Sequence, residues 1–341
     1  MSGYLRIVFF TAPRREVRSC TREANLPSAV DLERWPDLPY AAWKDTYETL
    51  HLWTQIIGKI RLTHEPWLNH SWHVPLYVTV RGLTTSPIPV GGRALQIDFD
   101  FIDHLLWLRT SDGHVRQVML APKTVAGFYG EVAMALVELG LETQIFTQPS
   151  EIADGVPFEE DHVHAAYDRD HANRLWRILL STQQVFSRFR TGFLGKVSPV
   201  HFFWGGFDLA VTRFSGRRAP LHPGGIPRLP DPITREAYSH EVSSAGFWPG
   251  GGPIDYPTFY SYAYPAPDGY ASAAVQPQQA FFSKEFGEFL LPYDAVRSAA
   301  DPDATLMAFL QSTYEAAANL GKWDRDSLEC TIGVPSRPRP L

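Results

Sequence analysis

The chain has 341 residues, of which 44% are hydrophobic and 20% are charged, and its 31 basic and 37 acidic side chains give a net charge of −6. This composition is typical of a folded globular protein and excludes a chain that is disordered as a whole, while the length predicts more than one lobe. The negative net charge argues against a grip on the phosphate backbone of nucleic acid, so we expect no nucleic-acid partner.

Residues 1–26 carry five arginines and no apolar periodicity. They are consistent with a basic targeting arm or with a disordered or mis-started tail, and the composition favours the tail. The apolar run YLRIVFFTA in this segment is well short of the ~20 residues that a membrane span requires. The two cysteines, Cys20 and Cys330, cannot build a disulfide framework. We therefore expect a cytoplasmic protein that is not bound to a membrane.

The first half of the chain is predicted to run helix, strands, helix. Residues 41–62 place large apolar side chains at steps of three and four, which indicates an amphipathic helix, and a second such helix is expected over 122–139. Between them, alternating apolar and β-branched residues predict strands over 73–85, 94–110 and 114–121.

The second half is predicted to repeat this order. A helix is expected over 165–190, and the chain closes on a helix over 302–320 whose N-cap is Asp301. The strands predicted between these two helices cover residues 198–217, 239–248, 258–264 and 288–293. The Pro- and Gly-rich segment 218–258 is too long for a plain connection, and we expect it to cover a site.

These elements predict an α+β fold with two pseudo-repeated lobes, each an antiparallel sheet backed by helices. Sliding the first half by 128 positions gives only five identities, so the expected duplication depends on the shared order of elements. We predict a disordered or mis-started tail over 1–26, lobes over 27–150 and 151–330, and a C-terminal tail over 331–341.

The stretch SPVHFFWGGFDLAVTRFSGR, residues 198–217, carries polar groups that a buried strand does not need. Along a regular strand, His201 and Asp208 point to opposite faces unless a bulge intervenes. The paired Gly205 and Gly206 allow such a bulge or the close approach of a ligand. The alternative is a sheet that bends around a bulky aromatic core.

Histidines near strand starts form one candidate site. By the expected repeat, His73 and His201 would face each other across the two lobes, His240 would join them, and Glu241 would act as ligand or general base. Two or three imidazoles with a carboxylate suit zinc or non-haem iron, with His70, His73, His201 and His240 as candidate metal ligands. The sequence matches no helical zinc motif, and the alternative is that these histidines are hydrogen-bonded structural residues.

Arginines and tryptophans complete this candidate site. Arginine binds carboxylate or phosphate through two parallel hydrogen bonds, so Arg81, Arg213 and Arg217 are candidates for holding a small anionic substrate. The alternative is a structural network with the aspartates Asp98, Asp100 and Asp208. The tryptophans expected to keep water out of the site are Trp72, Trp204 and Trp248.

Several long runs resemble a bacterial family that is defined only as a domain of unknown function, DUF5996. They include LPYAAWKDTYETLHLWTQIIGKIRL, NHSWHVPLYVTVRGLTT, REAYSHEVSSAGFWPGGG and FYSYAYP, and the resemblance spans about residues 35–329. It implies a bacterial protein occupied by one family domain, and it implies no activity and no functional residues.

Three function classes follow from these residues. The leading hypothesis is an enzyme that acts on a small anionic substrate in a His-rich, aromatic-walled cleft between the lobes, with or without a metal. The second is a small-molecule binding protein that uses the same cleft without turnover, and the third is a structural or interaction protein. The sequence does not set the oligomeric state, and it contains no dinucleotide, P-loop, serine-hydrolase or thiol-redox motif.

Overall fold

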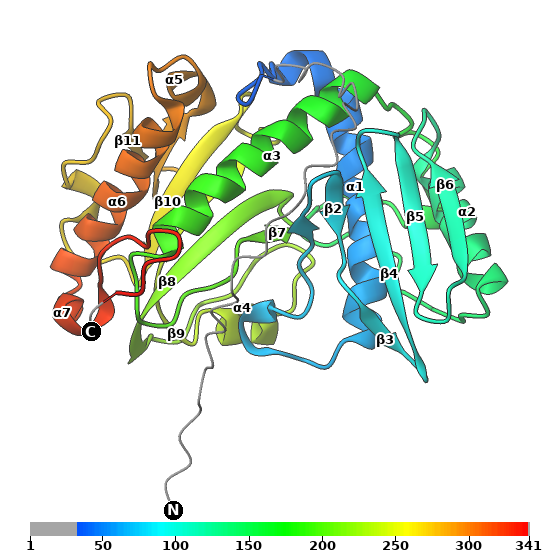
Figure 1. Ribbon diagram of the computed structural model, residues 1–341, viewed down its shortest axis with the longest axis horizontal. Helices are drawn as coiled ribbons and strands as arrows, with labels where there is room; N and C mark the ends of the chain where they lie inside the picture. Colours follow the sequence, from blue (N-terminus) through cyan, green and yellow to red (C-terminus); the bar gives the residue numbers. More distant parts are fainter. Residues whose placement is uncertain (1–32, 340–341) are drawn as a thin grey trace, which may run out of the picture. The chain divides into compact units, whose positions relative to one another are not determined.

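The computed structural model describes residues 33–339, which contain seven α-helices and two six-stranded antiparallel sheets (Figure 1). The predicted α+β class with two sheet lobes is therefore confirmed. The predicted tail over residues 1–26 lies outside the described residues. No helix within residues 33–339 combines the length and apolar character that crossing a bilayer requires.

The first sheet comes from the first half of the chain. Its strands are β1 (Tyr77–Val78), β2 (Gly82–Thr84), β3 (Ile88–Val90), β4 (Arg93–Asp100), β5 (Leu105–Thr110) and β6 (Val115–Met119). They pair in the order β1-β2-β4-β5-β6, and β3 pairs with β4.

The second sheet comes from the second half. Its strands are β7 (His201–Phe203), β8 (Asp208–Arg218), β9 (His240–Trp248), β10 (Thr258–Tyr264), β11 (Phe281–Ser283) and β12 (Glu288–Pro292). They pair in the order β11-β12-β10-β9-β8-β7. Each sheet thus contains a five-strand meander in chain order, with β3 and β11 as additions.

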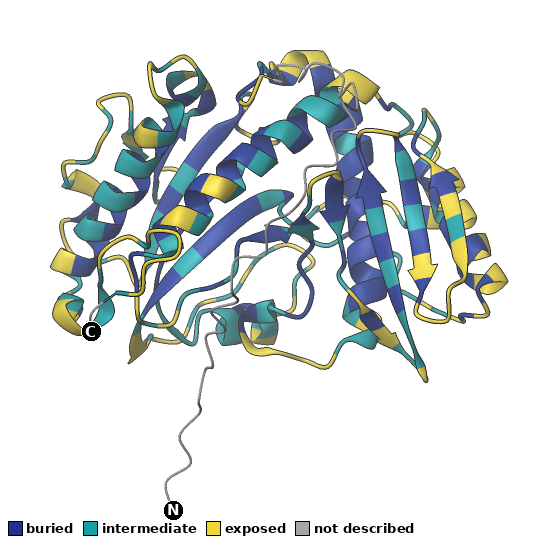
Figure 2. Cartoon of the chain, viewed as in Figure 1, coloured by how far each residue is buried: buried dark blue, intermediate teal, exposed yellow. Residues whose placement is uncertain are grey.

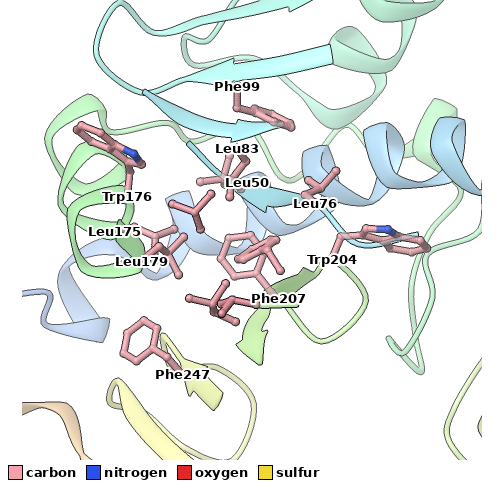
Figure 3. Close-up of a cluster of buried hydrophobic side chains, with 14 of the residues drawn as sticks. Leu50, Leu76, Leu83, Phe99, Leu175, Trp176, Leu179, Trp204, Phe207 and Phe247 are labelled. Atoms are coloured by element: carbon pink, nitrogen blue, oxygen red, sulfur yellow. The ribbon is translucent and has the colours of Figure 1, made fainter. Parts of the chain in front are cut away.

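The two sheets meet through one antiparallel bridge between Leu76 and Phe202. The amide of each residue donates to the carbonyl of the other at 2.9 Å. Side chains around this bridge form a core that spans both halves of the chain, and it includes Leu50, Leu83 and Phe207 (Figure 3). We infer that the halves share one hydrophobic interior.

The helices and short turns complete the chain. They are α1 (Tyr40–His64), η1 (Asn69–Ser71), α2 (Val125–Glu138), η2 (Phe158–Glu160), α3 (Arg169–Arg190), α4 (Asp231–Ala237), η3 (Tyr270–Ser272), α5 (Tyr293–Arg297), α6 (Pro302–Leu320) and α7 (Arg325–Leu328). The four long helices lie where the apolar periodicity predicts them. The predicted cap Asp301 accepts a hydrogen bond from the amide of Ala304 at 2.9 Å, which satisfies a free donor of α6.

Helix α1 is the most deeply buried of these elements. Every residue from Thr49 to Arg61 is buried, which Figure 2 shows as a continuous dark-blue stretch. A helix buried on all sides must satisfy its polar side chains inside the protein. This requirement applies to His51, Gln55 and Lys59, which lie four residues apart on one face of α1.

Three predicted strands are each a pair of strands. Residues 73–85 divide into the antiparallel strands β1 and β2. Residues 94–110 divide into β4 and β5 because the Asp100 carboxylate accepts hydrogen bonds from the amides of Ile102 and Asp103, at 2.9 and 3.0 Å, and so forms a turn. Residues 198–217 form the β7–β8 hairpin, whose turn contains Phe207 with a φ of 57°. A bulky residue with positive φ is uncommon, and the strand pattern gives no sign of it.

Candidate functional site

A cavity of about 890 Å³ lies on one face of the second sheet. Both halves of the chain contribute to its lining, with residues 59–74 and 146–151 from the first and residues 203–262 from the second. The aromatic residues of the lining are Trp67, Trp72, Phe146, Phe203, Trp204, Phe214, Tyr238, Tyr260 and Tyr262. This size and character are typical of sites for small molecules.

The alternation of the second sheet selects which side chains reach the cavity. On β8 these are Asp208, Ala210, Thr212 and Phe214. Thr212 pairs with Ser244 on β9, and Ser244 pairs with Tyr262 on β10, so the lining continues across the sheet. The opposite face of β8 packs towards α3, and α6 packs on β9 and β10 (Figure 1).

His51, Gln55 and Lys59 form a polar stripe on α1. This stripe binds two loops at the floor of the cavity, one containing Ser150 and one containing Gly205. His51 Nε2 lies 2.8 Å from the carbonyl oxygen of Gly205 and donates to it as the neutral tautomer. Gln55 donates to the Ser150 carbonyl at 3.0 Å and accepts from the Ser150 amide at 2.8 Å. Lys59 Nζ donates to the Ser150 hydroxyl at 3.1 Å. Burial lowers the pKa of His51 to about 4, so this histidine stays neutral.

Glu151 follows directly on the residue that this stripe fixes. Its backbone has a φ of 62°, a conformation that bulky L-residues rarely adopt, and its carboxyl group lies against the Gly205–Gly206 turn. A Cβ on Gly205 would lie 2.0 Å from Glu151 Oε1. Glycine at this position is therefore what leaves room for the carboxyl group.

Asp208 brings a second carboxyl group to the same turn. A Cβ on Gly206 would lie 2.8 Å from Asp208 Oδ1 and 3.9 Å from Glu151 Oε2, so the two groups flank one glycine. Among residues 33–339, neither carboxylate has a cationic side chain within 4 Å. The pair therefore has no counter-charge in direct contact, although Glu151 is exposed to the cavity and Asp208 is half-buried.

The surroundings of the pair favour its neutral forms. Burial, and then the nearby Asp208, raise the pKa of Glu151 to about 7, although the residue is accessible from the cavity. Burial also raises the pKa of Asp208 to about 6, and this rise is limited by the hydroxyl of Tyr260, which donates a hydrogen bond to Asp208 Oδ2. Two carboxyl groups with pKa values near neutrality can exchange protons at physiological pH.

Tyrosines surround this pair on the floor of the cavity. The rings of Tyr260 and Tyr262 stack with their centroids 6.2 Å apart, and the hydroxyl groups of Tyr262 and Tyr238 lie 2.8 Å apart. Burial raises the pKa of all three phenols, so they remain protonated. They supply hydrogen-bond donors without adding charge.

Part of the Pro- and Gly-rich segment 218–258, which was expected to cover a site, lines the cavity. Residues 226–238, which include α4, line the cavity. Arg228 of this segment donates to the Ala153 carbonyl at 2.8 Å and to Gln148, which connects it to the loop that carries Glu151. Trp67 donates to Glu236 across the cavity rim.

Four of the sequence-predicted residues line the cavity: His70, Trp72, His73 and Trp204. His70 Nδ1 lies 2.7 Å from the Ala237 carbonyl oxygen and Nε2 lies 2.6 Å from Lys196 Nζ, so both ring nitrogens are engaged. His73 Nδ1 lies 3.2 Å from the Leu68 carbonyl oxygen. Burial lowers the pKa of both rings.

The other predicted histidines, His201 and His240, do not line the cavity, although each lies next to a residue that does. His201 shares a face of the hairpin with Asp208, because the turn brings His201 opposite Ala210 and Phe203 opposite Asp208, but its ring is buried against Trp72, Tyr77 and Phe203. Burial, followed by the charges of Arg61 and Arg190, lowers its pKa to about 3. His240 contacts Ser239, and its ring centroid lies 6.1 Å from that of His70.

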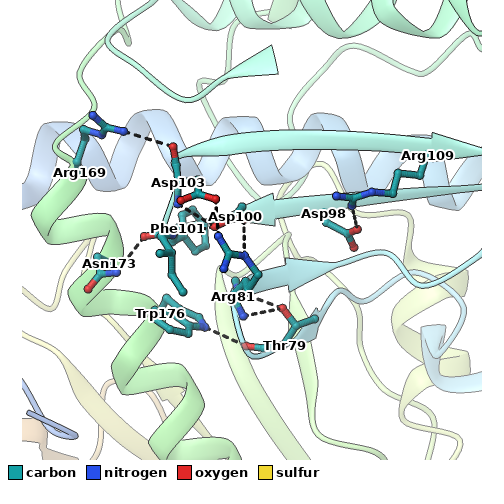
Figure 4. A network of polar contacts seen from close by, with 12 residues as sticks. Thr79, Arg81, Asp98, Asp100, Phe101, Asp103, Arg109, Arg169, Asn173 and Trp176 are labelled. Atoms are coloured by element: carbon teal, nitrogen blue, oxygen red, sulfur yellow. Dashed lines mark hydrogen bonds and ion pairs between the residues drawn. The ribbon is translucent and has the colours of Figure 1, made fainter. Parts of the chain in front are cut away.

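The predicted arginines and Glu241 have protein partners elsewhere. Arg81 binds Asp100 and Asp103 at 2.6 Å each (Figure 4). Arg217 binds Glu241 at 2.6 Å. Of the structural network that the sequence left open as an alternative, the Arg81–Asp100 pair is present. Arg217 pairs with Glu241 instead of an aspartate, and the partner of Asp98 is Arg109.

Arg213 and Trp248 also lie off the lining. Arg213 points to the helix-covered face of β8, where its guanidinium lies 3.5 Å from the centre of the Phe189 ring and donates to the Phe189 carbonyl at 2.6 Å. Trp248 ends β9 and does not line the cavity. Within residues 33–339, no three His, Cys, Asp or Glu side chains gather closely enough to hold a metal ion.

A comparison with known protein families bears on the whole of this architecture. The model of a family described as "Family of unknown function (DUF5996)" matches residues 35–330. The chain belongs to this family. No curated protein and no solved structure gives a significant match. Membership confirms the resemblance found in the sequence and assigns no activity, so the function must be argued from the cavity.

The raised pKa of Glu151 predicts a pH-dependent effect on stability. Because its pKa is higher in the folded protein than in the unfolded chain, its contribution is full below about pH 4.5 and is lost as the pH rises through about 7. We expect Glu151→Gln to gain about 1 kcal/mol of unfolding free energy relative to wild type between pH 5 and pH 8, after allowance for screening by water in the cavity.

Urea unfolding of both proteins at the two pH values measures this difference. The buried histidines are present in both proteins, so their effects cancel. Glu142→Gln, at an exposed position, serves as the matched control and should show no such gain. A difference between wild type and Glu151→Gln that does not change with pH would contradict the raised pKa.

Proposed function

We propose that the protein is an enzyme that carries out acid–base chemistry on a small molecule held in the cavity. The observation that supports this most strongly is the Glu151–Asp208 pair, two carboxyl groups beside one glycine turn with raised pKa values and no cation in contact within residues 33–339. Perturbed carboxyl groups in a cleft are typical of catalytic acids and bases.

The two carboxyl groups have different roles in this proposal. Glu151 has the higher pKa, so it keeps its proton to higher pH and acts as the acid. Asp208 is held by the Tyr260 hydroxyl, which stabilises its ionised form, and it acts as the base. The aromatic lining limits water around the pair and so strengthens its electrostatic interactions with a bound molecule.

The cavity also suggests how a substrate would be oriented. The lysine and arginine side chains on its lining are Lys59 and Arg228. Arg213 and Arg217 bind other parts of the protein and do not line the cavity. An anionic group on the substrate would accordingly lie towards Arg228, at the edge formed by residues 226–238. The reacting part of the molecule would lie on the floor, between the carboxyl pair and the tyrosines.

Incubation of the purified protein with a cell metabolite extract in D₂O tests this function. We expect the wild type to deplete or deuterate at least one compound, as seen by mass spectrometry, and the double variant Glu151→Gln/Asp208→Asn to leave that compound unchanged. Circular dichroism and urea unfolding establish that the variant is folded.

The opposite result would favour the non-catalytic alternative. If native mass spectrometry shows that the wild type retains a compound from the extract, yet no compound is converted, the protein is a binding protein. The large apolar lining is compatible with this second function, since such cavities also occur in proteins that only bind.

A further inference from the structure

Lys59 is the lysine that lines the cavity, and its surroundings differ from those of a surface lysine. The residue is 4% exposed, and its ammonium group lies 5.4 Å from the centre of the Phe146 ring and 5.8 Å from that of Trp204. Among residues 33–339 no carboxylate lies within 4 Å of Nζ, and its hydrogen bond is to the Ser150 hydroxyl.

Two other lysines, Lys44 and Lys123, have carboxylate partners. Lys44 lies 3.8 Å from Glu48, and Lys123 lies 2.6 Å from Glu131. Among residues 33–339, Lys196, Lys284 and Lys322 have none within 4 Å, and Lys59 differs from these three in lining the cavity. A carboxylate partner keeps an amine protonated and unreactive, and Lys59 lacks one. Burial lowers the pKa of Lys59 to about 8, so a sizeable fraction is the neutral amine in mildly alkaline solution. Neutral lysine in an apolar pocket is a nucleophile for carbonyl carbon.

We propose that the substrate is an aldehyde or ketone and that Lys59 binds it covalently as an imine. The proposal rests on the acid–base function above and names the substrate class for the same cavity. Lys59 is held in place for this role from both directions, by its position on the buried helix α1 and by its hydrogen bond to the residue that precedes Glu151.

The proposed step conserves atoms and charge. The Nζ lone pair attacks the carbonyl carbon, and one Nζ proton moves to the carbonyl oxygen to give a carbinolamine. Glu151 then donates its proton to the hydroxyl group, which leaves as water, and the C=N bond forms as a protonated imine. The ionised Glu151 then becomes a counter-charge for this cation within the cavity.

Reductive trapping tests the proposal. The full-length protein is incubated at pH 7.5 with benzaldehyde, hexanal or acetophenone and sodium cyanoborohydride, and modified lysines are mapped by peptide mass spectrometry. We expect the Lys59 peptide to be modified at least about tenfold faster than Lys44, because more of its amine is neutral at this pH. Lys59→Arg should lose that modification and keep the labelling of Lys44.

The outcomes separate this proposal from the proposed function. Modification spread over surface lysines, with Lys59 unmodified in a protein that converts a metabolite, overturns the imine and leaves the acid–base function standing. Trapping at Lys59 in a protein that converts no metabolite supports the imine and contradicts the proposed function. Because trapping is measured on the wild type, the result does not depend on whether a variant folds.

Discussion

Glu151→Gln and Asp208→Asn are each expected to lower turnover of the converted metabolite by about 10²- to 10⁴-fold, the range over which a positioned acid or base contributes to rate. Each change keeps the size of the side chain and removes its ability to exchange a proton. Glu142→Gln, on the exposed loop after α2, is the control and should keep wild-type turnover. Single-variant rates measured by mass spectrometry check this result.

The pH dependence of the turnover rate tests the roles of Glu151 and Asp208 in a second way. With pKa values of about 6 and 7, the pair holds one proton between these values, so the wild-type rate should peak there and fall on either side. Tyr260→Phe removes the hydroxyl that lowers the pKa of Asp208, so the acid limb should move to higher pH. Burial, and then the charge of Asp208, raise the pKa of Glu288 to about 7, so Glu288 titrates above the acid limb. An unchanged profile in all these variants would contradict the assignment of the pair.

Gly58→Ala is expected to destabilise the protein by about 1–3 kcal/mol, the cost of overpacking a filled interior. A Cβ on Gly58 of α1 would lie 2.1 Å from Trp204 Nε1. The indole cannot move freely, because Nε1 donates to the Val74 carbonyl at 2.9 Å. Trp204 of the cavity lining therefore packs directly on α1 at Gly58, where only glycine leaves room for the indole.

Gly130→Ala provides the matched comparison. Gly130 lies within helix α2, and a Cβ there would meet nothing within 4 Å. Removing a glycine from an open helical position stabilises a helix by up to about 1 kcal/mol. Urea unfolding of both variants should therefore give shifts of opposite sign, and a similar loss in both would show that Trp204 does not constrain Gly58.

Much of the fold could be predicted from local patterns. Helices α1, α2, α3 and α6 appear in the sequence as apolar stripes, and the cap of α6 appears as Asp301 followed by proline, because these signals act within a few residues. The β7–β8 hairpin could not be predicted in the same way. Apolar residues continue through the turn, and Phe207 occupies a backbone conformation that its residue type does not indicate.

The site depended on contacts between distant parts of the chain. Glu151 lies in an irregular segment, and what places it is the pairing of Gln55 with Ser150, 95 positions apart in sequence. The one signal for it in the sequence was the polar stripe His51, Gln55 and Lys59, which repeats every four residues within an otherwise apolar helix. The positions of the histidines in the sequence did not locate the site in the same way. Whether a ring such as that of His201 reaches the cavity depends on how it is buried in the folded protein.

Strand alternation did contain information about the arginines. Asp208, Ala210, Thr212 and Phe214 share one face of β8, so Arg213 must point to the other. The sequence does not show which of the two faces lines the cavity, and the three-dimensional structure was needed to decide this. The cavity includes Trp72 and Trp204 of the predicted aromatic residues. The proposed site centres on two carboxyl groups, of which Asp208 was placed in a structural network from the sequence and Glu151 was not singled out.

The titration of the Glu151 and Asp208 carboxyl carbons, followed by ¹³C NMR and assigned with the two amide variants, tests the central claim most directly. The account predicts midpoints at about pH 7 for Glu151 and about pH 6 for Asp208. Ionisation of both groups below about pH 5, as for exposed carboxyl groups, would contradict it.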